Sequence, residues 1–150
     1  MNIKQIKQLR DETGVGIMEA KKALEEAQGD LLKAKKILKE RGLVKAKKKA
    51  DRDTAEGRVQ AYIHGEGRVG ALIELSCETD FVAKNEAFVQ LANEIGMQVA
   101  AMDAKDVKAL LAQDYIRDSS KKISDLIHEA VAKLGENIVI CRFERFEVGN

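Results

Sequence analysis

The spacing of apolar residues changes once along the chain, and this change constrains the fold more than any other feature. From Ile3 to Leu43, apolar residues recur every three or four positions, as in helices that bury one face. From Arg58 to Cys77 they alternate with other residues, which is typical of strands. The chain therefore divides into a helical front part and a later part that holds a sheet, which predicts an α+β fold.

Three short helices are expected in the front part. Thr13-Gly14-Val15-Gly16 separates the first helix from the second, because glycine adopts backbone angles that stop a helix. Gln28-Gly29-Asp30 supplies a glycine stop and then an aspartate N-cap for the third helix. Residues 1–43 are thus predicted to form a three-helix module. The lysine-rich stretch 44–55 is predicted to be a basic linker, because it has no apolar face to bury. Extension of the third helix into this stretch is the alternative, although the sequence shows nothing that would hold it in place.

The remaining residues, 56–150, are predicted to form an α+β core. About three antiparallel strands are expected, at Arg58–His64, Arg68–Cys77 and Ile138–Val148. Gly65-Glu66-Gly67 is expected to turn the first strand into the second. Two long helices are expected over one face of this sheet, and Ser119 and Ser120 are predicted to cap the second of them.

The charges are balanced overall but not along the chain. The net charge is +1, yet residues 1–52 hold 15 basic and 8 acidic residues, so the front part is basic and the rest acidic. No apolar run approaches the roughly 20 residues of a membrane-spanning helix, and the chain begins with polar residues rather than a signal peptide. We expect a cytoplasmic protein that does not bind membranes.

A search for reactive groups finds no catalytic constellation. Cys77, Cys141, His64 and His128 are not spaced as metal ligands, and neither histidine has a nucleophile placed beside it by the sequence. We therefore predict no catalytic residues, no metal and no cofactor, while the residues alone leave open an enzyme whose site they do not reveal.

One polar turn, residues 77–85, differs from the rest because it contains Phe81, one of only six aromatic residues. In one interpretation, Thr79 or Asp80 caps the following helix and Phe81 folds back on the sheet. In the other, Phe81 projects as an anchor for a partner protein. The residues alone leave both interpretations open, although the first is commoner for an arbitrary sequence.

Three segments resemble the signatures of one family. Thr79-Asp80-Phe81-Val82-Ala83-Lys84-Asn85 resembles the signature of the elongation factor Ts family. The segment Ile6–Leu24 resembles the amino-terminal signature of the same family. Gly135-Glu136-Asn137-Ile138, leading into Arg142-Phe143, resembles its last strand. The matches occur in the order found in the family and span both predicted parts of the chain.

The resemblance implies a function and a site. It implies a ubiquitin-associated-like three-helix module joined to an α+β core, and a guanine nucleotide exchange factor for elongation factor Tu in translation elongation. Because nucleotide exchange changes no covalent bond, the resemblance also implies that the protein is not an enzyme. Asp80 and Phe81 would form a wedge beside the magnesium site of that partner, with Thr79 and Val82 shaping the turn. The partner would be bound with GDP or free of nucleotide. No direct nucleic acid binding is required by this reading.

The resemblance also implies a second copy of the chain. Between Met102 and Tyr115 there are only twelve residues, where longer family members insert a helical hairpin and a second core lobe. Short members of this kind resemble homodimers, so we expect a homodimer, and a two-fold pairing would also cover the edge of the small sheet. Cys141 in the last strand is expected to be a buried, reduced thiol.

Two other functions compete with this one. The first is a small RNA- or ribosome-associated protein that uses the basic module and linker. The second, ranked last, is an enzyme of the acidic core.

Overall fold

The computed structural model describes residues 2–150, which begin with a module of three helices. They are α1 (Ile3–Thr13), α2 (Ile17–Glu26) and α3 (Leu31–Lys49). The predicted stops are confirmed. Gly14 ends α1 with a φ of +73°, and the Asp30 side chain accepts hydrogen bonds from the first N–H groups of α3. The buried interior of the module consists of leucines and alanines, namely Leu9, Ala20, Ala23, Leu24, Ala27, Ala34 and Leu38.

The third helix continues past the module, and this corrects the linker predicted at 44–55. α3 runs to Lys49 and packs along α7 (Ile123–Leu134) of the core. Ala46 is buried among core residues. Gly42 is also buried, and a Cβ atom at that position would lie 3.7 Å from the Ala132 side chain. Small residues let the two helices approach closely, so residues 44–49 do have a face to bury. Residues 50–55 lie outside helices and strands.

The core contains a three-stranded antiparallel sheet, as predicted. Its strands are β1 (Glu56–His64), β2 (Val69–Cys77) and β5 (Val139–Glu147), in the order β1-β2-β5. The first two strands form a hairpin in which His64 lies opposite Val69 and Ala61 lies opposite Leu72. The middle strand therefore has both its edges paired.

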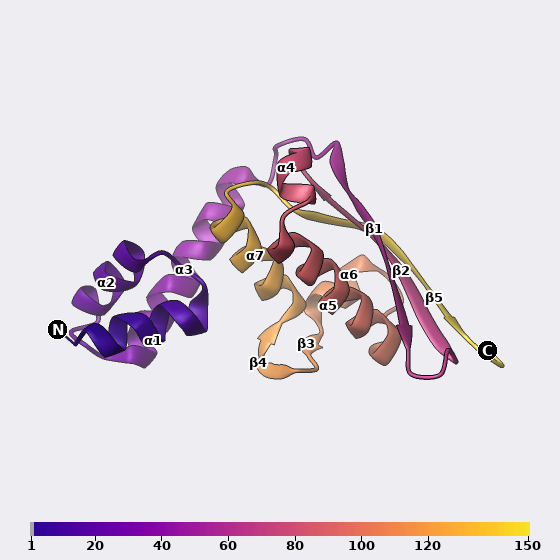
Figure 1. Cartoon of the computed structure of the whole chain (residues 1–150), viewed down its shortest axis with the longest axis horizontal. Coiled ribbons are helices and arrows are strands. Elements are labelled where there is room, and N and C mark those ends of the chain that lie inside the picture. The colour runs from indigo at the N-terminus through magenta and orange to yellow at the C-terminus, as the bar shows by residue number, and fades with distance from the viewer. Residues whose placement is uncertain (1) are drawn as a thin grey trace.

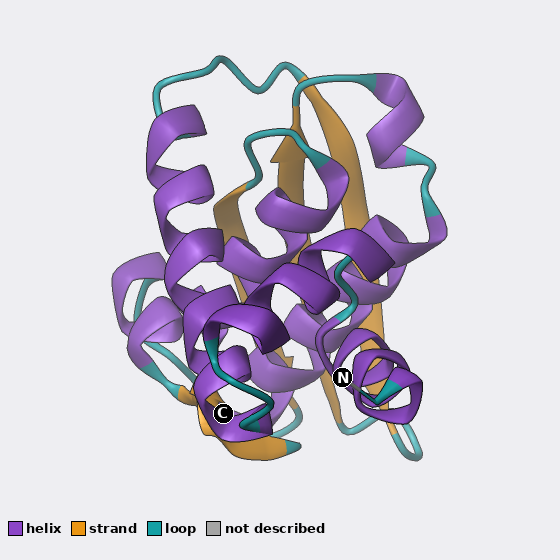
Figure 2. Cartoon of the chain, turned by 90° about the vertical axis from the view of Figure 1, so that its left-hand side faces the viewer, coloured by secondary structure: helices purple, strands orange, loops and turns teal. Residues whose placement is uncertain are grey.

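Helices cover one face of this sheet, as Figures 1 and 2 show. α5 (Glu86–Met102) packs on all three strands, and α6 (Val107–Ala112) packs on β5. α7 lies against α5 and α6 and carries α3 on its other side. The largest side chains buried between these layers are Phe88, Ile73, Leu75, Ile95, Leu110 and Ile123. No helix covers the opposite face of the sheet within the described residues.

The start of α7 differs from the sequence prediction. Ser119 and Ser120 do not cap a helix but lie in β4 (Asp118–Lys122), which pairs with the short strand β3 (Asp114–Tyr115). Ser120 donates to the side chain of Asp118 at 2.6 Å, a local bond that competes with a capping role.

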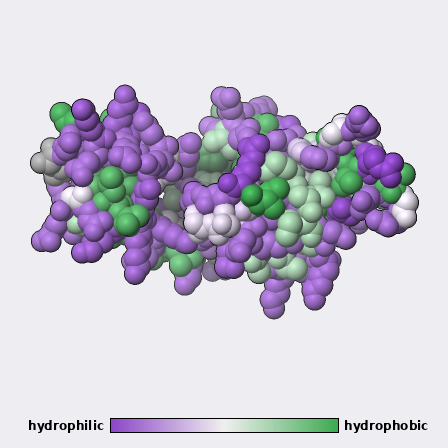
Figure 3. Space-filling model, turned by 90° about the horizontal axis from the view of Figure 1, so that it is seen from below, coloured by the Kyte–Doolittle hydropathy of each residue, from purple (hydrophilic) through white to green (hydrophobic). Residues whose placement is uncertain are grey.

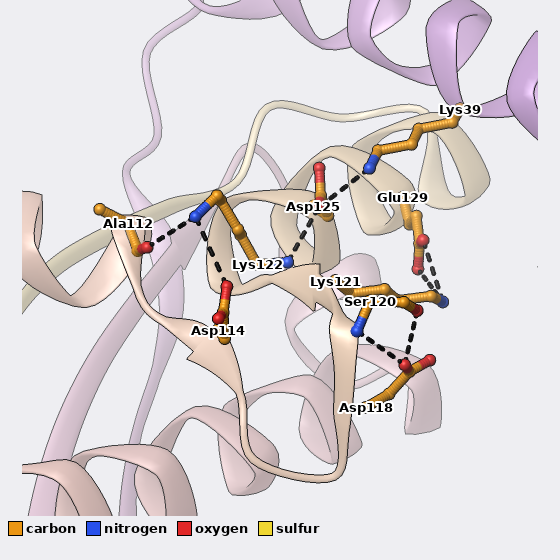
Figure 4. Close-up of polar contacts among 9 residues, drawn as sticks. All are labelled: Lys39, Ala112, Asp114, Asp118, Ser120, Lys121, Lys122, Asp125 and Glu129. Atoms are coloured by element: carbon orange, nitrogen blue, oxygen red, sulfur yellow. Dashed lines mark hydrogen bonds and ion pairs between the residues drawn. The ribbon is translucent and has the colours of Figure 1, made fainter.

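Asp125 caps α7 and also links it to the module, as Figure 4 shows. Its carboxylate accepts a hydrogen bond of 2.9 Å from the backbone N–H of Lys122. The same carboxylate lies 3.3 Å from the ammonium group of Lys39 in α3. One side chain thus stabilises the beginning of α7 and joins it to the module.

Candidate partner-binding turn

The turn singled out in the sequence connects β2 to the helical layer. It contains the one-turn helix α4 (Asp80–Ala83) between Cys77, which ends β2, and Asn85, which caps α5. The hydroxyl oxygen of Thr79 accepts a hydrogen bond of 3.3 Å from the N–H of Val82. Thr79 therefore caps a helix as predicted, but the helix is α4 rather than the long α5.

Phe81 projects into solvent, with 82% of its surface exposed. The interpretation in which it folds back on the sheet is therefore wrong. Asp80 is exposed beside it and forms an ion pair of 3.6 Å with Lys84. Val82 packs against the core, and the next residue, Ala83, is buried. The turn thus faces the core on one side and presents a carboxylate and an aromatic ring on the other.

A carboxylate from a distant part of the chain holds the backbone of this turn. Glu136 follows the glycine that ends α7, and one of its oxygens accepts hydrogen bonds from the N–H groups of Glu78 and Thr79, at 3.1 and 3.0 Å. Its other oxygen accepts a bond of 2.7 Å from the Thr79 hydroxyl. All three donors belong to the two residues that precede Asp80.

Asn137 extends this network to the end of α3. Its backbone N–H donates to the carboxylate of Glu78 at 3.2 Å. Its buried side-chain amide donates to the carbonyl oxygens of Ala50 and Arg52, at 3.3 and 2.8 Å. The Arg52 guanidinium lies 3.6 Å from Glu78. The segment that leaves the module and the turn that presents Phe81 therefore meet at one cluster of hydrogen bonds.

Sequence reasoning did not assign these contacts to Glu136 and Asn137. One signal could have found them. Two polar residues stand between a glycine that ends a helix and the apolar strand that begins at Ile138. Polar side chains at such a buried junction require partners, and the polar turn before Asp80 offers unpaired backbone N–H groups.

The cysteine that precedes the turn is buried at the end of β2. Burial is the main cause that raises the pKa of the Cys77 thiol, and the nearby carboxylate of Glu136 raises it further. A protonated thiol is a poor nucleophile and a poor metal ligand. Within residues 2–150, no group of three or more His, Cys, Asp or Glu side chains could hold a metal ion.

Among the described residues, none of the helices combines the length and the apolar character required to cross a bilayer.

A second exposed apolar surface belongs to the module. Ile17 and Met18, just after the glycine loop at the start of α2, are 56% and 62% exposed. Figure 3 shows hydrophobic surface on the module, in the middle of the view and at the far end of the molecule, where the sheet protrudes, with hydrophilic side chains around each area. A groove of about 690 Å³ lies between α3, the glycine loop and α7, and side chains of both charges line it.

The described residues define an α+β protein in two parts, with an exposed aromatic turn between its sheet and its helical layer. Residues 78–150 match the family model described as Elongation factor TS. Elongation factor Ts of Coprothermobacter proteolyticus is 44% identical to this chain, over 96% of the chain and 96% of that protein. The protein of the same name from Leptospira biflexa is 45% identical, over 97% and 96%, and that of Thermosipho melanesiensis is 40% identical, over 99% of each.

The chain belongs to the elongation factor Ts family. It is therefore a translation elongation factor with a role in protein biosynthesis.

Proposed function

We propose that this chain is a guanine nucleotide exchange factor, which binds elongation factor Tu with GDP and promotes the exchange of GDP for GTP in the cytoplasm. In this proposal the module of residues 1–43 docks on the nucleotide-binding domain of the partner, and the core of residues 56–150 contacts a further domain. The main support is the turn at Thr79–Val82, where an aromatic ring and a carboxylate project from a junction held by hydrogen bonds.

The physical argument starts from the bound nucleotide of the partner. Magnesium bridges phosphate oxygens and requires nearly ideal octahedral geometry. A large side chain that displaces the surrounding helices slightly would weaken the binding of the ion and of the phosphates together. Phe81 has the size for such a displacement, and Asp80 places a negative charge next to it. No covalent bond changes, so the protein accelerates an exchange and has no catalytic residues.

Thermodynamic linkage gives the proposal a second consequence. If this protein weakens the binding of GDP to elongation factor Tu, GDP must weaken the binding of this protein by the same factor. The nucleotide-free complex is then the tightest one, and GTP completes the exchange by displacing this protein.

Release of a fluorescent GDP from elongation factor Tu tests the proposal. We expect the wild-type chain to accelerate release, and we expect Phe81→Ala to lose most of this effect, on the order of a hundredfold for a central aromatic anchor. Asp80→Ala should lose less. Ile116→Ala is the matched control, because Ile116 is an exposed apolar residue of the β3–β4 hairpin.

Two results would separate the parts of this proposal. No acceleration by the wild-type chain would reject exchange activity. Acceleration that Phe81→Ala leaves intact would keep the activity and reject the wedge at Thr79, Asp80, Phe81 and Val82.

We further propose that the open face of the sheet binds a second copy of the chain. Val59, Ile63, Leu72 and Phe146 are all at least 47% exposed on this face, and the pairing of the strands places them on one side. Two such faces can pack against each other as the layers of a sandwich. Cys141 is exposed rather than buried as predicted, because its strand has no helix over this side.

The alternative of an RNA-associated protein has less support. Three lysines of α3 form ion pairs within the chain, namely Lys35 with Glu12, Lys39 with Asp125 and Lys45 with Glu19. Such pairs reduce the positive charge available to phosphates. Tight RNA binding that weakens steeply with added salt would instead favour this alternative.

A further inference from the structure

Phe81 lacks contacts that could fix its own position. With 82% of its surface exposed, the ring is not held by packing, so its direction depends on the backbone of α4 and of the two residues before it. A one-turn helix does not hold itself together, because forming the first turn fixes several residues for few hydrogen bonds. Contacts from outside the turn must therefore order it.

Val82 and Ala83 anchor one side of the turn in the core, and the carboxylate of Glu136 supplies the polar contacts from outside it. The N–H groups of Glu78 and Thr79 lie beyond the last paired residues of β2, and Glu136 accepts from both of them. It also accepts from the Thr79 hydroxyl, whose oxygen in turn accepts from the N–H of Val82. The Thr79 hydroxyl therefore links the Glu136 carboxylate to the N–H of Val82 in α4. The hydrogen bonds that depend on Glu136 thus restrain the backbone both before and after Phe81.

The sequence separation of these contacts is large. Glu136 lies 57 residues from Thr79 and begins the connection from α7 to β5. The turn is therefore anchored to the helical layer and not only to its own strand. Hydrogen bonds to a charged acceptor are stronger than those between neutral groups, and three on one carboxylate restrain both its position and that of its donors.

We infer that Glu136 is a positioning residue for the exchange reaction, because its carboxylate fixes the backbone of Glu78 and Thr79 and thereby presents Asp80 and Phe81 in a single orientation. This inference rests on the proposed exchange activity. The turn is ordered before the partner arrives, so binding does not have to order it.

Two substitutions of Glu136 test the inference. In Glu136→Ala the maximal rate of GDP release from elongation factor Tu should fall about tenfold, while the concentration for half-maximal rate should change less than about twofold. The module and the rest of the core still bind, which is why mainly the maximal rate responds. Glu136→Gln keeps an acceptor for the backbone N–H groups, so it should restore part of the rate.

A double variant shows whether Glu136 acts through Phe81. If it does, Glu136→Ala should add less than about twofold to the loss in Phe81→Ala. Glu129→Ala is the matched control, because Glu129 is another carboxylate at the surface of α7 and pairs with Lys121. An unchanged maximal rate in Glu136→Ala would overturn the inference. So would a loss in the double variant that equals the product of the losses in Glu136→Ala and Phe81→Ala. A wild-type chain without activity would instead reject the proposed function.

Hydrogen–deuterium exchange of the free protein gives a readout that needs no partner. Glu136→Ala should exchange the amides of Glu78, Thr79 and Val82 at least about tenfold faster than the wild type, and Glu129→Ala should not. In Thr79→Val only the amide of Val82 should exchange faster, because its acceptor is removed. This variant provides the test if Glu136→Ala does not fold. Equal protection of these amides in the wild type and in both turn variants would refute the positioning role.

Discussion

The two faces of the sheet carry similar apolar residues but differ in what covers them. On the inner face, Ile73 and Leu75 have no exposed surface, because α5 packs over them. On the outer face, Leu72 is 47% and Ile63 64% exposed. The inner residues stabilise the fold by leaving water, whereas the outer residues gain this benefit only when a partner covers them. An apolar residue in a strand therefore serves folding or binding according to its face.

The pairing of β1 with β2 explains why both faces are apolar. Ala61 lies opposite Leu72, so each odd-numbered residue of β1 shares a face with an even-numbered residue of β2. The apolar residues of the alternating pattern are odd-numbered in both strands. They must therefore lie on opposite faces, and only those of β2, such as Ile73, meet the helices.

The largest difference between the faces should appear in stability. Ile73→Ala removes a fully buried side chain and should lower the free energy of unfolding by about 3 kcal/mol. Leu72→Ala, the neighbouring position on the outer face, should lower it by less than about 1 kcal/mol. Urea unfolding at low protein concentration measures both values. Similar losses in the two variants would show that the outer face is also covered.

The pairing of β1 with β2 places Gly57 and Gly70 on the same, outer side of the sheet, yet the two positions differ in what an added side chain would meet. Gly57 has a φ of +149°, and a Cβ atom there would lie 2.2 Å from the backbone oxygen of Leu75. Gly57→Ala should therefore cost about 2 kcal/mol, measured by thermal unfolding. At Gly70 the added atom would clash with the end of the Ile63 side chain, at 2.6 Å, which can turn into solvent, and would lie at 3.4 Å from the backbone oxygen of Tyr62. Gly70→Ala should cost about half as much or less, and the reverse order would contradict this argument.

A charge on the outer face should affect association more than folding. Leu72→Asp should weaken self-association at least about tenfold, which is about 1.4 kcal/mol, because a buried carboxylate would face apolar residues. Sedimentation velocity over a range of concentrations measures the change. Leu32→Asp adds the same charge at an exposed position of the module and should leave association unchanged. A wild-type chain that stays monomeric would reject the proposed homodimer.

The smallest expected effect is a dependence of the folding stability on pH, which arises from His128. Burial between α7 and α3 lowers the pKa of His128, and the charge of Lys47 lowers it further, although Asp125 opposes them. As pH falls below about 6.5, the unfolded chain binds a proton before the folded one does. Stability should therefore decline from there until pH drops below the pKa of folded His128.

Urea midpoints between about pH 8 and about pH 5 detect this decline. His128→Gln removes the titrating group, so its midpoint should decline less over the same range. A variant that declines as steeply as the wild type would assign the effect to other groups.

Local signals in the sequence were sufficient for much of the fold. The glycines at 14 and 29, the cap at Asp30 and the turn at 65–67 act through their own backbone or nearest neighbours, and the structure confirms each of them. The exposure of Phe81 was one of two interpretations, and only the structure distinguishes them.

The features that sequence reasoning missed depend on distant partners. Ala46 lies in the predicted linker, but the close approach of Gly42 to Ala132 brings α3 against α7 and buries it. The two serines at 119 and 120 are good caps in isolation, but pairing of β3 with β4 assigns them to a strand. Glu136 meets the candidate turn across 57 residues; its place between a glycine and an apolar strand indicates that it needs a partner, but not which one.

The continuous α3 also sets an angular relation between the two parts of the molecule. Leu38 packs inside the module, whereas Lys39 and Gly42 already face α7, so one helix serves both parts within two turns. Each residue of a helix adds about 100° of rotation and 1.5 Å of rise. One inserted residue after Leu38 would swing the module to another side of the core, whereas seven would nearly restore its direction, about 10 Å further out. A change in the length of α3 therefore rotates the module about the helix axis and also moves it along that axis, and the rotation is the larger effect.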